Sequence, residues 1–184
     1  MQVAAEKVFC SADAVLCAAR AQTAFPARPA AGKNDADKPE FPMLTLAQAQ
    51  TILQNALSHA GSNGFKPLAI AVLDARGAQK TFAAQDGTSL KRGEIALGKA
   101  HGAVALGIGS RAIHKMALDR PYFVEAATHA VGGSLVPVPG GVLIRSPEGA
   151  LLGAVGISGD TSDNDEAAAC AGIAAAGLKA DTGA

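Results

Sequence analysis

The sequence predicts an α+β domain in which helices pack on an antiparallel β-sheet of four to five strands. Two pairs of short apolar segments are each joined by a tight turn, which is typical of β-hairpins. Helical patterns flank and separate these pairs, and the expected order is α-β-β-α-α-β-β-α. The chain has 184 residues, 49% of them hydrophobic and 17% charged, so it is long and apolar enough to fold around a core.

The first helix and the first hairpin are predicted over residues 45–84. Thr45 and Gln48 form a capping box at the start of a helix that we expect to run to His59. Its apolar residues recur at helical spacing. After a Gly-rich break, residues 67–73 and 79–84 read as two strands, and the Asp-Ala-Arg-Gly turn at 74–77 joins them.

Two or three helices are predicted between the hairpins. The first is capped by Thr88 or Ser89 and continues to about Gly107, and a second covers residues 110–118. Pro121 suits the first position of a further helical segment that ends before Gly132-Gly133. A fifth short strand is expected around residues 135–138.

The second hairpin and the last helix place polar groups at one rim of the sheet. Residues 142–144 and 151–157 are apolar runs, and Ser-Pro-Glu-Gly at 146–149 supplies the turn between them. An acidic loop follows, and Ser162 or Asp163 is the expected N-cap of a helix over Asp163–Leu178. Free backbone N–H groups and carboxylates are therefore expected to meet where the last hairpin reaches this helix.

Residues 1–43 are predicted to be an extension and linker, and residues 44–180 the folded domain. The extension is Ala-rich and proline-bearing, and Glu6 and Asp13 interrupt the apolar stretch that a secretory signal would need. We therefore expect a cytoplasmic protein, with export as the alternative. A mobile tail is the simplest interpretation of this segment.

Composition excludes several classes of function. Lys plus Arg equals Asp plus Glu at 16 each, and the chain has no Trp and one Tyr, so nucleic-acid binding is not expected. No segment is long and apolar enough to cross a membrane. The three cysteines, Cys10, Cys17 and Cys170, have no metal-ligand spacing and predict neither a zinc site nor a disulfide framework.

Several motifs, in order, resemble the GlcG/HbpS family over about Leu44 to Leu178. This family is also described as haem-binding or "haem-degrading" domains, and it is related to the C-terminal domain of a cobalamin adenosyltransferase. The motifs are LTLAQAQTIL at 44–53, AVLDARG at 71–77, the Lys99–Val104 segment, PGG at 139–141, the glycine-rich segment 153–159 and D-x-D-E at 163–166.

The resemblance implies a small-ligand binding protein for haem or a related tetrapyrrole. Haem iron needs a donor side chain in an apolar pocket, and His101 is the first candidate ligand, with His59 as the second. The other cofactor-binding candidates are Lys99, Gly140, Gly141, Asp165 and Glu166. Basic residues of the middle helices are candidates to meet haem propionates: Lys91, Arg92, Lys99, Arg111 and Lys115.

Simpler interpretations of the same residues stay open. Acids at a helix start favour the helix dipole, and paired glycines serve a turn as well as a close approach to a ligand. An alternative function is an accessory enzyme or subunit acting on a small carboxylic acid, of the glycolate or diol-metabolism type. Lys99 and Glu166 would then converge as proton-transfer groups. The small-residue helices also predict a homo-oligomer with a dimer unit, extending to an octamer.

Overall fold

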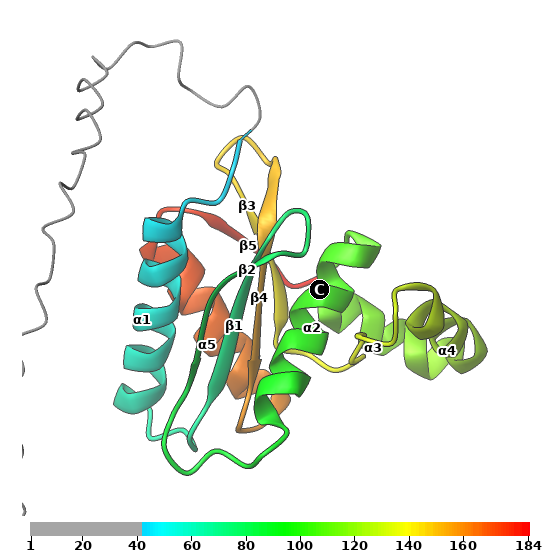
Figure 1. The fold of residues 1–184 in the computed structure, drawn as a ribbon, viewed down its shortest axis with the longest axis horizontal. Coiled ribbons are helices and arrows are strands. Elements are labelled where there is room, and N and C mark those ends of the chain that lie inside the picture. Colours follow the sequence, from blue (N-terminus) through cyan, green and yellow to red (C-terminus); the bar gives the residue numbers. More distant parts are fainter. Residues whose placement is uncertain (1–41) are drawn as a thin grey trace, which may run out of the picture. The chain divides into compact units, whose positions relative to one another are not determined.

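A computed structural model describes residues 42–184, so nearly all of the predicted extension lies outside the described residues. The described part contains one five-stranded antiparallel sheet with the order β2-β1-β4-β3-β5 (Figure 1). The two predicted hairpins, β1-β2 and β3-β4, join through pairing of β1 with β4. The strands are β1 (Ala69–Asp74), β2 (Gln79–Ala84), β3 (Gly141–Arg145), β4 (Leu151–Ser158) and β5 (Lys179–Asp181).

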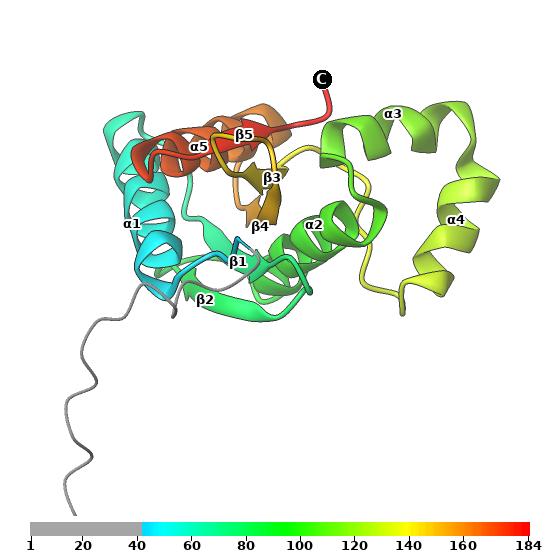
Figure 2. The ribbon, with the colours of Figure 1, turned by 90° about the horizontal axis from the view of Figure 1, so that it is seen from above.

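Helices cover both faces of this sheet. Helices α1 and α5 lie together on one face and α2 lies on the other (Figure 2). Helices α3 and α4 extend from the α2 side, away from the strands (Figure 2). The helices are α1 (Leu46–Ser62), α2 (Arg92–Leu106), α3 (Ser110–Asp119), α4 (Pro121–Ala130) and α5 (Ser162–Ala175).

Alternation along each strand divides the core into two layers. Successive side chains of a strand point to opposite faces. In β1, Ile70 and Val72 belong to the core under α1 and α5, whereas Ala69, Ala71 and Leu73 face α2. Strands β3 and β4 repeat the pattern, and their large residues toward α1 and α5 are Val142, Ile144, Val155 and Ile157.

Glycine allows α2 to approach the sheet closely. A Cβ added at Gly156 of β4 would overlap the backbone oxygen of Ala96 in α2, and one added at Gly141 of β3 would overlap that of Lys99. Only a residue without a side chain fits such a contact. The α2 backbone therefore rests directly on β3 and β4.

The fold class and element order agree with the sequence prediction, and the capping box of Thr45 and Gln48 is present. Several boundaries differ. The N-cap of α2 is Lys91, without a side-chain cap, and not Thr88 or Ser89. Helix α1 continues to Ser62 and α5 ends at Ala175. The fifth strand is β5, and residues 135–138 are not a strand, because Pro137 and Pro139 cannot donate to a ladder and Leu135 is buried beside α2 and α3. The N-cap of α5 is Thr161, whose hydroxyl accepts the Asn164 N–H at 3.3 Å.

Candidate functional site

A buried ion pair lies between α2 and α5 at the end of the second hairpin. Lys99 Nζ is 2.8 Å from Asp165 Oδ2 and also donates to the Ile157 carbonyl oxygen at 2.8 Å. The two side chains are 2% and 1% exposed. The Asp160 N–H donates to Asp165 Oδ1 at 3.1 Å. The acidic loop, α2 and β4 are therefore held together by one lysine and one carboxylate.

Burial moves both members of this pair toward their neutral forms. Desolvation lowers the pKa of Lys99 and raises the pKa of Asp165, and the opposite charge of each partner counteracts the shift. A buried pair of this kind contributes little net stability, but removing one partner leaves a costly buried charge. The pair therefore fixes the position of α2 against α5.

Gly140 and Gly141 complete the same cluster. Gly140 has φ of +110°, and a Cβ added there would lie 2.9 Å from Lys99 Nζ and 2.9 Å from Asp165 Cβ. The Gly141 N–H donates to Ser110 Oγ at 2.7 Å in the interior. Both glycines thus serve close approach as well as a turn, and the group they approach is the chain's own lysine.

Glu166 lies beside this cluster but has a different partner. Arg111 Nε of α3 donates to Glu166 Oε1 at 2.9 Å and to Oε2 at 3.2 Å, and the Arg111 guanidinium also pairs with Asp163. Hydrogen bonds to these two acids raise the pKa of Arg111. Lys99 binds Asp165 rather than Glu166, so the structure brings five of the predicted residues together in a different pairing.

His101 occupies the outer side of α2. Its Nδ1 is 3.0 Å from the Ser134 carbonyl oxygen, and because a carbonyl only accepts, Nδ1 carries the proton. In the neutral ring Nε2 then keeps its lone pair. A Cβ added at Gly77, in the β1-β2 turn, would lie 3.9 Å from Nε2. A histidine held by a carbonyl in this way is the arrangement that metal-ligating histidines use.

Apolar side chains continue along the same side of α2. Leu97 and Val104 are one turn from His101 in either direction and are partly buried. Phe82 of β2 is 45% exposed and Leu90 is 91% exposed. A pocket of about 250 Å³ lies here, lined by Gln79, Phe82, Leu90, Gly93, Glu94 and Leu97. We call Phe82, Leu90, Leu97, His101 and Val104 the α2 outer face.

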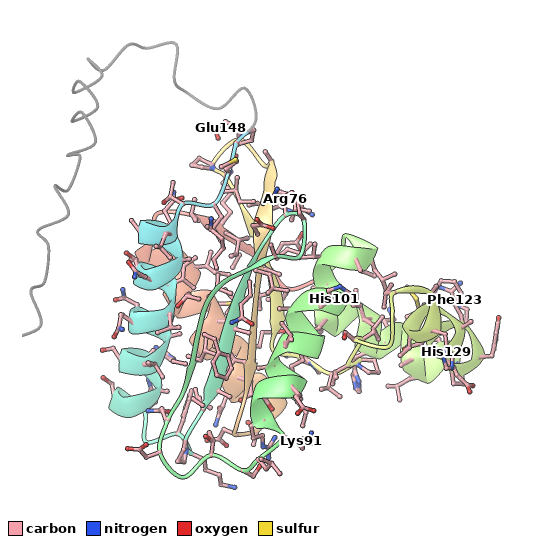
Figure 3. All side chains as sticks on the ribbon, viewed as in Figure 1. Arg76, Lys91, His101, Phe123, His129 and Glu148 are labelled. Carbon is pink, nitrogen blue, oxygen red and sulfur yellow. The ribbon has the colours of Figure 1, made fainter. Side chains whose placement is uncertain are left out.

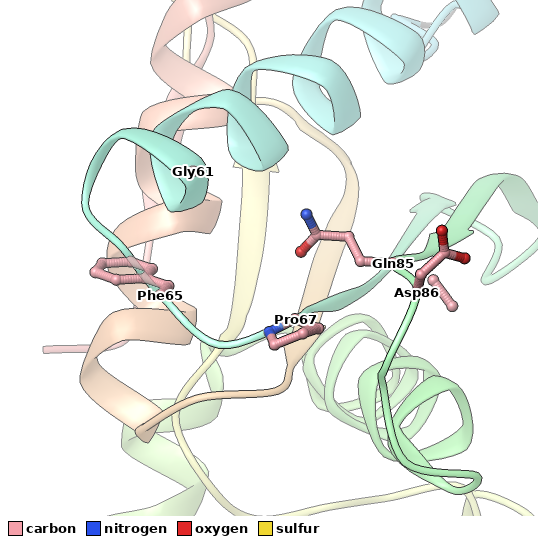
Figure 4. A pocket seen from close by; sticks show the side chains of 6 residues that line it. Gly61, Phe65, Pro67, Gln85 and Asp86 are labelled. Atoms are coloured by element: carbon pink, nitrogen blue, oxygen red, sulfur yellow. The ribbon is translucent and has the colours of Figure 1, made fainter.

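His59 is placed at the opposite end of the fold, in the last turn of α1. Its ring packs edge-on against Phe65, with ring centres 5.8 Å apart. Phe65 lines a wide pocket of about 470 Å³ together with Gly61, Pro67, Ala84, Gln85 and Asp86 (Figure 4). Gln85 Oε1 accepts the Leu68 N–H at 2.8 Å. This pocket is polar on its Gln85 and Asp86 side and offers a second, less apolar place for a ligand.

Two features are absent from residues 42–184, the part of the chain that the structure describes. In this part of the chain no three His, Cys, Asp or Glu side chains are grouped so as to hold a metal ion. Among the described helices none is long and apolar enough to cross a membrane. A ligand that brings its own metal and needs one donor from the protein is compatible with the first result.

Sequence reasoning missed Ser110 and gave Arg111 a different role. Ser110 accepts the Gly141 N–H. Arg111, a candidate to meet a haem propionate, bridges α3 to α5 instead. Ser110 follows a helix break at Gly107–Gly109 and has no motif around it. Arg111 was counted only as one of several basic residues, since its distance to α5 depends on the path of α3.

Comparison with known proteins decides the family. The family model described as "Haem degrading protein HbpS-like" matches residues 44–174, which is most of the chain. The chain belongs to the HbpS-like family. Comparison with curated protein sequences gives no match.

Three solved structures illustrate the likeness in fold. The crystal structure titled "PduOC:Heme Complex" has a TM-score of 0.67 and 23% identity, and covers 75% of this chain and 98% of that one. Protein ORFY of Klebsiella pneumoniae has a TM-score of 0.68 and 22% identity, covering 77% and 95%. HbpS has a TM-score of 0.64 and 24% identity, covering 78% and 96%. At these identities the likeness establishes the fold.

Proposed function

We propose that this HbpS-like chain binds haem or a related tetrapyrrole, and that the α2 outer face carries the site. The observation that carries the proposal is the His101 ring, with its Nδ1 proton held by the Ser134 carbonyl and Nε2 left as a donor near Gly77 of the β1-β2 turn. Membership of the family described as haem-degrading and the heme complex of PduOC support the choice of ligand.

The residues present fit such a group. Leu97, Val104 and Phe82 provide apolar surface for a macrocycle, and His101 Nε2 is the nitrogen donor that haem iron takes from proteins. The 250 Å³ pocket is below the usual range of ligand sites, so the macrocycle would be held along one edge and stay partly exposed. Bound haem would supply a redox-active iron, and the chain's part is to hold and orient it.

Lys91 is the proposed partner for a propionate. It lies next to Leu90 at the start of α2, the helix that also carries His101 (Figure 3). Its ammonium pairs with Glu94, and both side chains are about two-thirds exposed. An exposed pair of this kind is weak and exchanges readily with another carboxylate.

The Lys99 cluster has a positioning role in this proposal. Lys99 and Asp165 are buried and bonded to each other, so their polar atoms hold α2 in place instead of facing a ligand. His101 lies two residues farther along the same helix, which places it on the other side of α2. Gly140, Gly141, Asp165 and Glu166 thus act on the ligand through the position of α2.

Hemin titration of the purified full-length chain tests the proposal. We expect a Soret band that saturates stoichiometrically, a large loss of affinity in His101→Ala, and no change in His59→Ala. Lys91→Met should weaken binding several-fold, since it removes one charge-assisted contact. A flat titration of the parent chain would refute haem binding. Loss of binding in His59→Ala but not in His101→Ala would move the site to the α1 end.

We also propose that the chain assembles into a homo-oligomer with a dimer unit. Support comes from the α3-α4 arm, where Leu118 and Tyr122 are 72% and 71% exposed and Phe123 is 42% exposed, with Arg120 over its ring. Clustered exposed apolar residues are typical of interaction surfaces. Light scattering should give a mass of two or more chains, and Tyr122→Glu should lower it. A monomeric parent chain would contradict this.

A further inference from the structure

We propose that a second pocket, at the turn end of the β1-β2 hairpin, binds a small amphipathic monocarboxylate. This pocket has a volume of about 360 Å³, within the usual range of small-molecule sites. Its lining joins apolar and charged residues: Pro42, Met43, Leu44, Asp74, Ala75, Arg76, Lys80 and Leu152. It shares no residue with the α2 outer face, although His101 lies against Gly77 of the turn that carries Arg76.

The floor of the pocket is apolar and belongs to the packed core. Leu44 and Leu152 are 1% and 4% exposed and belong to the core between the sheet and helices α1 and α5. Met43 is 61% exposed and lies at the rim. A methionine side chain is flexible and polarisable, so it adapts to an aliphatic or aromatic body placed against it. The floor therefore selects a ligand with an apolar part.

The charges of the rim select an anion. Asp74 is occupied by its own turn, because Oδ1 accepts the Arg76 and Ala78 N–H groups at 2.9 and 3.0 Å and Oδ2 accepts from Arg76 Nη2 at 3.1 Å. Arg76 is the exposed member of that pair, at the tip of the hairpin (Figure 3). Lys80 is half-buried and has no carboxylate partner among residues 42–184.

Two cations against one carboxylate leave the pocket lining with one net positive charge. That balance matches a single carboxylate better than a dianion or a phosphate ester. Lys80 supplies a point charge, and the Arg76 guanidinium has further N–H donors beyond the one that Asp74 uses. The pocket therefore fits a monocarboxylate with an apolar body, such as a fatty acid of medium chain length or an arylalkanoic acid. Its carboxylate would lie at Lys80 and its apolar body on Leu44 and Leu152.

Calorimetric titration of the full-length chain with octanoate tests this inference, with 1-octanol as the uncharged probe of the same length. We expect saturable octanoate binding that Lys80→Met weakens about tenfold, a typical loss for one charge-assisted contact in a partly exposed site. Met43→Gln, at an exposed position, should weaken the binding of both octanoate and 1-octanol. Lys115→Met, on the outside of α3, is the matched control and should bind octanoate like the parent chain.

The outcomes separate this inference from the haem proposal. Octanoate binding that persists in His101→Ala, which removes hemin binding, supports a separate site. Absence of saturable binding at millimolar octanoate, or equal binding by the parent chain and Lys80→Met, would overturn the inference. Equal affinity for octanoate and 1-octanol would also overturn it, because a site without preference for the charge is a general apolar surface.

Discussion

The two faces of the sheet achieve burial in different ways. Toward α1 and α5 the strands present Ile, Val and Leu, and side-chain volume fills the space between the layers. Toward α2 they present mostly Ala and Gly beside Leu73 and Leu143, and at the glycines the helix backbone itself comes into contact with the strands. The first face is filled by large side chains and should tolerate small losses of volume. At Gly141 and Gly156 the second face has no room for an added side chain.

The functional residues follow this division. The close contacts of Gly141 and Gly156 with the α2 backbone fix the distance of this helix from the sheet and its rotation about its own axis. This orientation turns Lys99 inward to Asp165 and His101 outward. A helix that packed on the sheet only through large, flexible side chains would have a less precisely defined position. The comparison thus explains why a buried ion pair and a proposed ligand donor lie two residues apart on one helix.

The largest expected effect comes from breaking the buried pair. Lys99→Met should lower the free energy of unfolding by about 3–5 kcal/mol, because Asp165 is left as an unpaired buried carboxylate. The double variant Lys99→Met, Asp165→Leu should recover most of that loss. Urea denaturation of the parent and the two variants measures both values. A double variant as unstable as the single one would show that the pair does not act as a unit.

Substitutions at two neighbouring residues of β4, Gly156 and Ile157, allow the stability of the two faces to be compared directly. Gly156→Ala adds one methyl group where the Ala96 carbonyl lies and should cost about 3 kcal/mol, at the upper end of overpacking effects. Gly61→Ala is the matched control, since nothing lies within 4 Å of a Cβ there. In the last turn of α1 it should stabilise the chain by about 0.5 kcal/mol.

Ile157→Val makes the opposite change on the other face. It removes one methylene from the core under α1 and α5 and should cost about 1 kcal/mol, less than the methyl group added one residue earlier. Thermal unfolding followed by circular dichroism ranks the two variants. If Ile157→Val proved more damaging than Gly156→Ala, the contrast between the faces would be wrong.

The smallest effect is expected at the β1-β2 turn and depends on pH. Burial alone would raise the pKa of Asp74, but hydrogen bonds from the Ala78 and Arg76 backbone and the Arg76 side chain lower it below 3.8. A depressed pKa contributes stability that is complete above 3.8 and lost as the pH falls through the folded value. Asp74→Asn should therefore cost about 1 kcal/mol at pH 7, and this cost should shrink as the pH falls below 3.8.

Sequence patterns predicted the α1 and α5 face well and the α2 face poorly. Thr45, Gln48 and the recurrent apolar residues of α1 are local signals, and the apolar runs of β1 and β4 fit strands that are buried on both faces. Gly156 and Ala96 give no such signal, because small residues fit many environments. Their contact follows from the packing of distant segments.

The same limit applies to the candidate site. The sequence at the end of the last hairpin predicted that a polar cluster forms there, but not which of its residues pair. The cluster consists of Lys99, Gly140, Gly141, Asp165 and Glu166. Asp165 and Glu166 differ by one helical position, about 100° of rotation, which decides which of them faces Lys99 and which faces Arg111. Local sequence patterns also gave no sign that Ser134, just before the 135–138 segment, supports His101.

Absorbance spectra of hemin-loaded His101→Ala, recorded before and after imidazole is added, decide whether His101 is the ligand. We expect the variant to lack the spectrum of nitrogen-ligated haem, and free imidazole to restore it by taking the place of the missing ring. A variant whose spectrum already equals that of the parent chain would contradict the assignment of His101 and, with it, the proposed role of the α2 outer face.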